Sequence, residues 1–148
     1  MTKDIDSAEE LNGSSIRLIS IPFAGGNCYS FRDLPQHLAK PIEFVPVELP
    51  GRGRRFAEPL LTSLTDMAAD LFALIRDQIQ VPYALYGHSL GGRLAGLLVR
   101  RVIAEGLPNP VHLFVSGCPG VSVDRQRSRH QLPREEFFRM LREMDCPG

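Results

Sequence analysis

The chain has 148 residues, 43% of them hydrophobic, and its 17 basic residues balance 17 acidic ones. This length suits one domain with a single core, and a neutral chain has no overall field to gather nucleic acid or an anionic membrane. The first fifteen residues are polar where a signal peptide is apolar, and no later segment approaches 18 consecutive apolar residues. We therefore expect a cytoplasmic protein with a disordered N-terminus (1–15) and no nucleic-acid or membrane partner.

Four short apolar runs predict strands. "IRLISIPF" (16–23) is rich in β-branched residues and ends at a glycine turn, and "IEFVPVELPG" (42–51) is a second run with its own glycine stop. Both are typical of buried strands. "YALYG" (83–87) and "VHLFVSG" (111–117) predict a third and a fourth strand.

Two helices are predicted between these strands. From Ser63 to Gln80 apolar residues recur at helical spacing, and Ser63 with Asp66 forms a helix start signal. Residues 90–105 predict a second helix, closed by Gly106. Strands that alternate with helices imply a parallel sheet covered by helices. We therefore expect an α/β fold with a mostly parallel sheet and helices on both faces.

The sequence changes character beyond Gly117. Residues 118–132 are polar and basic, and no fifth strand follows. "PREEFFRMLREM" (133–144) predicts a helix with one apolar side, formed by Phe137, Met140, Leu141 and Met144.

The motif "GHSLG" (87–91) matches G-x-S-x-G, a serine nucleophile on a sharp turn between a strand and a helix. Its glycines, Gly87 and Gly91, leave room for the neighbouring strand and helix. A plain tight turn is the alternative, but the apolar strand before Ser89 and the small residues after it favour a nucleophile. His88 stands next to the nucleophile, where its side chain cannot easily face Ser89 Oγ, so we expect it to support the turn rather than to act as the base.

Two backbone N–H groups are expected to stabilise the oxyanion of a tetrahedral intermediate. One belongs to the residue after the nucleophile, Leu90, at the start of a helix. We assign the second to Ala24 in "PFAGGN" (22–27), because this loop follows the first strand and its glycines allow close approach. An ordinary glycine turn is the alternative.

The cysteines give no sign of a metal site or a disulfide framework. Cys28, Cys118 and Cys146 are odd in number and widely spaced, without a C-x-x-C motif or a histidine pair of zinc spacing. We expect reduced thiols and no bound metal.

Taken together, the motifs resemble those of the type II thioesterases that work beside nonribosomal peptide and polyketide synthases, within the α/β-hydrolase fold. The resemblance covers nearly all of residues 16–148 and implies a partial domain of this fold, with 118–148 as the start of a helical lid. As the inner portion of the larger hydrolase sheet, the four strands are expected in the order second, first, third, fourth. The stretches that carry it are "PFAGGNCYSFRDLPQHL" (22–38), "VELPGRGRRFAEP" (47–59), "YALYGHSLGGRLAGLL" (83–98), "LFVSGCPG" (113–120) and, in the position of the lid, "RHQLPREEFFRMLREM" (129–144).

The resemblance implies a reaction and a partner. Enzymes of this family remove acyl groups from the phosphopantetheine thiol of acyl or peptidyl carrier domains, through an acyl-serine intermediate. Carried over to this sequence, Ser89 is the nucleophile, and Ala24 and Leu90 are the oxyanion donors. No cofactor is implied beyond the phosphopantetheine that holds the substrate. A general carboxylester hydrolase is an alternative, which the "AGG" loop and "ELPGRGRR" disfavour.

The loop "GRGRR" (51–55) follows the second strand, at the edge where ligands meet open α/β sheets. Its arginines suit a phosphate or an acidic carrier protein. A solvated loop with salt bridges is the alternative.

The other two members of a catalytic triad are not evident. In α/β-hydrolases an acid and then a histidine follow the serine along the chain. Only His130 lies after the fourth strand, and His130, Asp124 and Asp145 fall in or beside the lid sequence. We therefore expect the base and the acid to lie outside this chain, which would be the inactive N-terminal part of a thioesterase. A noncatalytic remnant that binds an acyl or carrier partner, or a chain completed by a second one, are alternatives.

Overall fold

The computed structural model describes residues 15–119 and 133–144. Apart from Ser15, the N-terminal segment predicted to be disordered lies outside these ranges. Asp124, His130, Asp145 and Cys146 lie outside them as well.

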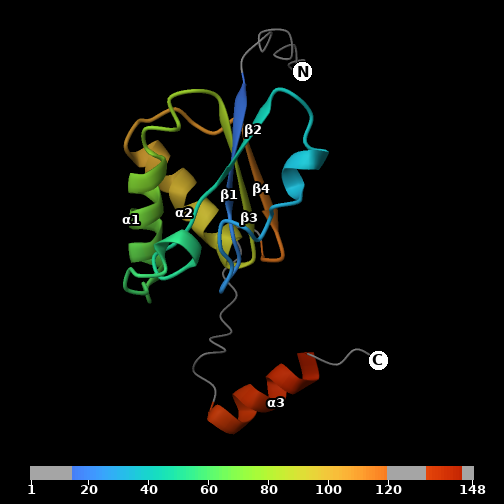
Figure 1. The fold of residues 1–148 in the computed structure, drawn as a ribbon. Coiled ribbons are helices and arrows are strands. Elements are labelled where there is room, and N and C mark those ends of the chain that lie inside the picture. The colour runs from blue at the N-terminus through green and yellow to red at the C-terminus, as the bar shows by residue number, and fades with distance from the viewer. Residues whose placement is uncertain (1–14, 120–132, 145–148) are drawn as a thin grey trace, which may run out of the picture.

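Four parallel strands form one sheet (Figure 1). Their order is β2-β1-β3-β4, which confirms the predicted order and direction. Because all the strands run the same way, the loops that leave their carboxyl ends meet at one edge of the sheet, where open α/β sheets bind ligands. The strands are β1 (Ile16–Ile21), β2 (Ile42–Pro46), β3 (Tyr83–His88) and β4 (His112–Ser116).

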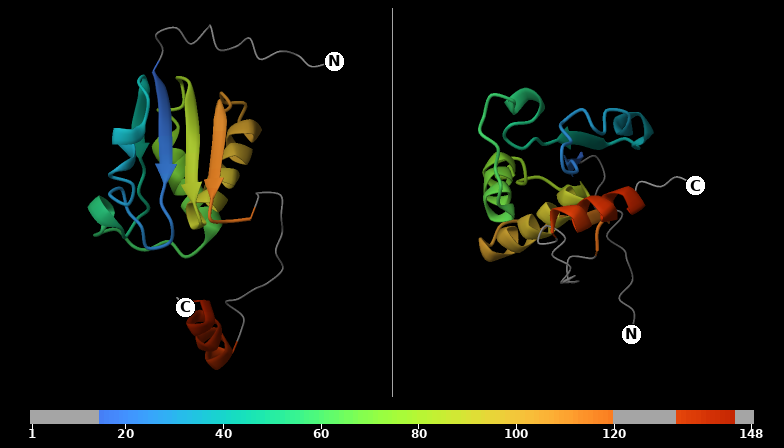
Figure 2. Two further views of the ribbon diagram at one scale, coloured as in Figure 1. Left: turned by 90° about the vertical axis from the view of Figure 1, so that its right-hand side faces the viewer. Right: turned by 90° about the horizontal axis from the view of Figure 1, so that it is seen from below.

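Two α-helices lie between the strands in sequence, α1 (Leu64–Ile75) and α2 (Leu90–Ala104). The predicted start signal of α1 is confirmed, because Ser63 Oγ accepts the N–H of Asp66 at 3.0 Å. The helix ends five residues earlier than predicted, and a turn follows it in which the N–H groups of Gln78 and Ile79 both donate to the carbonyl of Ile75. Figures 1 and 2 show α1 and α2 on the same face of the sheet.

The hydrophobic core lies between this face and the two helices. Its apolar side chains come from alternate positions of the strands, as expected where a strand buries one face, and from the inner sides of the helices. Fully buried members are Ile19, Ile21, Leu71, Ile75, Ile79, Tyr83, Leu85, Leu94, Ala95, Leu98 and Val102.

The other face of the sheet has lighter cover among the described residues. The short 3₁₀ helix η1 (Leu34–His37) lies on this side (Figure 1), and the Phe31 ring packs on Tyr86 with the centroids 5.2 Å apart. Phe114 of β4 remains 48% exposed. The predicted helices on both faces are therefore two α-helices on one side and, among the described residues, a short 3₁₀ helix on the other.

A third α-helix, α3 (Arg134–Met144), forms where the sequence predicts it. In Figures 1 and 2 it lies apart from the sheet, beyond the carboxyl ends of the strands. The apolar side chains predicted to face the site are not among those described, so its function as a lid stays a prediction. Across residues 15–119 and 133–144, no helix has the length and apolar character needed to cross a membrane.

Candidate active site

Ser89 lies on a sharp turn between β3 and α2. It is the only described non-glycine residue with a positive φ, at 53° with ψ at −113°. Such a conformation costs on the order of 1–3 kcal/mol and persists only where the surrounding structure enforces it. The prediction that Ser89 links the end of a strand to the start of a helix is confirmed.

Glycines allow the close packing around this turn. A Cβ on Gly87 would overlap the backbone of Gly91, and a Cβ on Gly91 would overlap the carbonyl of Ile21 at the end of β1. A Cβ on Gly92 would come within 2.6 Å of Cys118 Sγ. The turn is therefore packed so closely against its surroundings that none of these three glycines has room for a side chain.

Strand β4 holds the serine from the other side. The N–H of Ser89 donates to the carbonyl of Ser116 at 2.8 Å. Ser116 Oγ lies 2.9 Å from His88 Nδ1 and 3.2 Å from the hydroxyl of Tyr86. Sequence reasoning missed Ser116, although a parallel pairing of β3 with β4 places it directly beside His88. The parallel register of these two strands was the signal that would have identified Ser116.

The side chain of His88 is held in place by contacts around the turn. Besides its bond to Ser116, its ring packs edge-on against Phe23 at a centroid distance of 5.8 Å, and a Cβ on Gly117 would lie 2.5 Å from its Cε1. These contacts fit a supporting residue and leave little freedom for a general base.

The two expected oxyanion donors follow neighbouring strands at the same edge of the sheet. Leu90 is the first residue of α2, so its N–H is among those that a helix leaves without an intrahelical partner. Ala24 lies in a tight turn after β1, where the N–H of Gly26 donates to Phe23 at 2.8 Å and Gly25 has φ at +80°. Convergence of the Leu90 and Ala24 N–H groups on one point stays a prediction.

No general base reaches Ser89 within the described residues. His112 begins β4, at the opposite edge of the sheet, and stacks on Phe114 with the ring centroids 4.3 Å apart. His37 is exposed in η1. In the part of the chain that the structure describes, no histidine or carboxylate is hydrogen-bonded to Ser89 Oγ. His130 and Asp124 lie outside that part.

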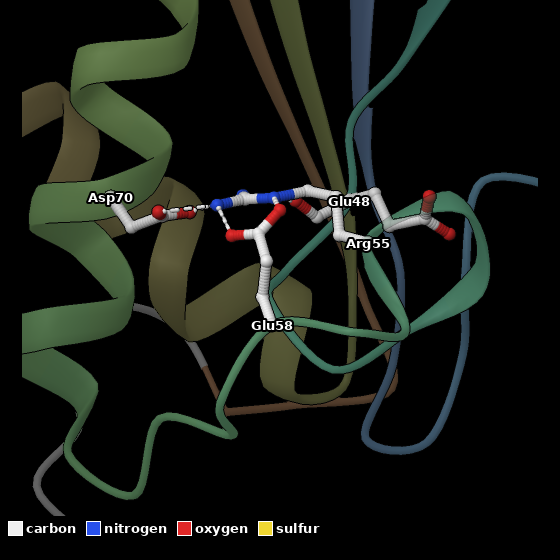
Figure 3. Close-up of polar contacts among 4 residues, drawn as sticks. All are labelled: Glu48, Arg55, Glu58 and Asp70. Carbon is white, nitrogen blue, oxygen red and sulfur yellow. Dashed lines mark hydrogen bonds and ion pairs between the residues drawn. The ribbon is translucent and has the colours of Figure 1, made fainter.

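The GRGRR loop contains one arginine that is engaged inside the protein. Arg55 forms two hydrogen bonds each with Asp70 of α1 (2.6 and 2.8 Å) and Glu58 (2.7 and 2.8 Å), as Figure 3 shows. These carboxylates raise the pKa of Arg55, and Arg55 in turn lowers the pKa of Glu58. For Arg55, the salt-bridge alternative is therefore the right one.

The other arginines of the loop have no ion-pair partner among residues 15–119 and 133–144. Arg54 is exposed, with its guanidinium 5.6 Å from the centre of the Tyr29 ring, and the neighbouring Tyr29 raises its pKa. Arg52 donates only to the carbonyl of Gly51, at 3.3 Å. Both remain open to a ligand or partner.

A buried carboxylate lies beneath this loop. Glu48 is 6% exposed and accepts the backbone N–H groups of Cys28 at 2.9 Å and Arg54 at 2.8 Å. Burial raises the pKa of the Cys28 thiol, with Glu48 adding to the effect, so Cys28 is a weak nucleophile. Sequence reasoning did not single out Glu48, because no local pattern marks it as buried.

Within the described ranges, no group of three or more His, Cys, Asp or Glu side chains is placed to hold a metal ion.

Comparison with known proteins gives a consistent result. Residues 16–146 match the family model of the thioesterase domain. The chain is 36% identical over 136 residues to the gramicidin S biosynthesis protein GrsT of Aneurinibacillus migulanus, covering 90% of this chain and 53% of that protein. The chain spans about half the length of the curated relatives it matches.

Solved structures agree. The thioesterase RedJ from the prodiginine pathway of Streptomyces coelicolor superposes with a TM-score of 0.76 at 31% identity, over 90% of this chain and 51% of RedJ. The type II thioesterase BorB from the borrelidin cluster gives 0.70 at 34% identity, over 90% of this chain and 54% of BorB.

Proposed function

The chain belongs to the thioesterase family, and from this premise we propose that Ser89 is the nucleophile that takes an acyl group from a carrier-bound thioester. The strained backbone of Ser89 at the junction of β3 and α2 is the observation that carries the proposal. Such a turn exposes a serine hydroxyl at the edge of an α/β sheet.

The reaction has two steps. Ser89 Oγ attacks the thioester carbonyl and gives up its proton to a base, and the tetrahedral oxyanion accepts the N–H groups of Leu90 and Ala24. The C–S bond then breaks, the thiol of phosphopantetheine leaves with a proton, and an acyl-Ser89 ester remains. Water hydrolyses this ester, which releases the acid and restores the serine. No other cofactor takes part.

No described histidine or carboxylate is hydrogen-bonded to Ser89 Oγ to act as the base for either step. The side chains of His37, His88 and His112 are placed elsewhere or engaged in other contacts. Because His130, the only histidine after β4 in the sequence, falls in the predicted lid, we propose that the 148-residue chain forms the acyl-serine slowly and does not turn over at an enzyme's rate. A noncatalytic chain that only binds the acyl carrier is the second candidate, favoured by the same observation.

Acylation of Ser89 tests the nucleophile. Incubation with a p-nitrophenyl acyl ester, followed by intact-mass and peptide mass spectrometry, should show one acyl group on the peptide that contains Ser89. Ser89→Ala should lose this adduct, whereas Ser116→Ala, which retains Ser89, should keep it. An adduct of equal yield in Ser89→Ala would overturn the assignment. Absence of any adduct in the wild type would favour the noncatalytic candidate.

The proposed partner is an acyl or peptidyl carrier domain of a cytoplasmic synthase. Two relatives support this: GrsT is named for gramicidin S biosynthesis, and BorB for the borrelidin cluster. Arg52 and Arg54 lie in the loop after β2, at the same edge as Ser89, and have no ion-pair partner among the described residues. Positive charge at this edge favours the approach of an acidic carrier surface.

Binding measurements test this partner. Arg54→Gln should weaken binding of a phosphopantetheinylated carrier domain about threefold to tenfold, and the loss should shrink as salt is raised. Arg76→Gln is the matched control, because Arg76 is an exposed arginine at the end of α1, on the opposite edge of the sheet. Equal binding by both variants would remove Arg54 from the carrier surface.

A further inference from the structure

Glu48 is a buried carboxylate that binds two separate loops. It follows β2, and each of its two carboxylate oxygens accepts one backbone N–H: Oε1 that of Cys28 and Oε2 that of Arg54. A buried carboxylate is tolerated only when its oxygens are hydrogen-bonded. A shift of the Glu48 carboxylate would therefore move the backbone at Cys28 and at Arg54, and a shift of either backbone segment would move the carboxylate.

The first of these loops carries Ala24. At its start, the Phe23 ring packs against His88 at 5.8 Å and Phe31 at 6.2 Å. At its end, the N–H of Cys28 is bound to Glu48. Ala24 lies between these two attachments, in a turn with Gly25 at positive φ. The loop is thus held to the serine turn at one end and to Glu48 at the other.

Glu48 is itself fixed to helix α1. Its main-chain carbonyl accepts Arg55 Nη1 at 2.9 Å, and the same guanidinium is held by Asp70 of α1 and by Glu58 (Figure 3). Gly53 completes the arrangement, because a Cβ there would overlap the Glu48 carboxylate. A continuous set of polar contacts therefore runs from α1 through Arg55 and Glu48 to the loop that carries Ala24.

We propose that Glu48 is a positioning residue that sets where the Ala24 N–H lies relative to Ser89. The proposal rests on the proposed function, in which that N–H stabilises the oxyanion. Such a donor acts only within about 2.7–3.1 Å of the oxyanion, so a displacement of about 1 Å is enough to weaken it. The motif "ELPGRGRR" thereby has a function within the protein besides any contact with a partner.

Backbone NMR of Glu48→Gln tests the proposal without requiring turnover. An amide side chain keeps the size but has one acceptor oxygen, and its NH₂ faces the second donor N–H. We expect amide exchange of Cys28 and Arg54 to rise about tenfold or more, which local opening makes measurable, and the Ala24 resonance to shift. Amides of β3 and α2 should keep their wild-type exchange. Glu43→Gln is the control, because it breaks an exposed ion pair near the start of β2 and leaves the Glu48 carboxylate and its contacts intact.

Three outcomes would overturn the proposal. They are an unchanged Ala24 resonance, unchanged exchange at Cys28, and a uniform rise in exchange that includes β3 and α2, which would make Glu48 a general stabilising residue. Acylation of Ser89 by the p-nitrophenyl ester provides a second readout, with the rate in Glu48→Gln expected to fall about tenfold while the ester concentration at half-saturation is unchanged. If the wild type is not acylated, the proposed function fails, but the NMR result still decides whether Glu48 holds the loop.

Discussion

The serine turn and the Arg55 cluster lie at the same edge of the sheet but are held by different forces. At the turn, Gly87 and Gly91 let backbone pack on backbone, and β4 adds a main-chain hydrogen bond to Ser89. In the cluster, charged side chains join Arg55 to Asp70, fifteen residues later in the chain. The first region depends on shape, the second on charge.

This difference determines how each region responds to change. Close backbone packing cannot relax around an added methyl group, so substitutions at the turn should affect the whole fold. Ion pairs at a partly exposed site lose strength with salt and with protonation of the carboxylates. Substitutions in the cluster should therefore have smaller effects that depend on conditions.

The largest effect is expected at Gly91. Gly91→Ala places a methyl group on the carbonyl of Ile21, and we expect the free energy of unfolding to fall by about 3 kcal/mol. Gly106→Ala is the control, because no atom lies within 4 Å of the added Cβ and only its positive φ opposes the change, at about 1 kcal/mol. Urea denaturation measures both. Equal losses would show that packing at the turn is not tight.

A middle-sized effect is expected where the cluster joins α1. Asp70→Asn breaks the ion pair with Arg55, which is joined by two hydrogen bonds and whose side chains are only 23% and 24% exposed. We expect the free energy of unfolding to fall by about 2 kcal/mol. Glu105→Gln, which breaks a more exposed pair with Arg101, should cost about 0.5 kcal/mol or less. If 1 M NaCl leaves the Asp70→Asn loss unchanged, charge is not what holds the cluster.

The smallest effect concerns pH. Arg55 lowers the folded-state pKa of Glu58 below its ordinary value of 4.5. The stability that this pair contributes is therefore present above pH 4.5 and is lost as pH falls through the lower, folded-state pKa. Melting temperatures of the wild type and Glu58→Gln should differ at pH 6, and the difference should shrink as the pH is lowered below 4.5. A constant difference across this range would mean that Glu58 acts through packing rather than charge.

The sequence predicted the backbone-determined features well. The strands themselves, the start of α1 and the turn at Ser89 follow from patterns that are local in the chain: hydrophobic period, a capping serine, glycines around a serine. The order of the strands was implied by the resemblance to the hydrolase sheet. The same local patterns did not predict where α1 ends, because burial of Ile79 in a following turn depends on the rest of the core.

Contacts between distant residues were harder to predict. The sequence offered two interpretations of the GRGRR loop, a ligand or partner contact and a set of salt bridges. The salt-bridge interpretation applies to Arg55, which is bound by Glu58 and Asp70, whereas Arg54 is exposed beside Tyr29. Glu48 and Ser116 were missed for the same reason. Their partners lie 20 and 28 residues away, respectively, and only the three-dimensional arrangement brings them together.

Steady-state turnover of a short-chain acyl thioester of pantetheine by the purified 148-residue chain tests the central claim most directly. That claim is that the described residues provide a nucleophile at Ser89 but no general base, so the account predicts a rate far below 1 s⁻¹, since loss of triad members typically costs several orders of magnitude. Turnover of about 1 s⁻¹ or faster, within the usual range of enzymes and abolished by Ser89→Ala, would contradict it. A base would then exist within the chain, and His130→Ala would show whether His130 is that base.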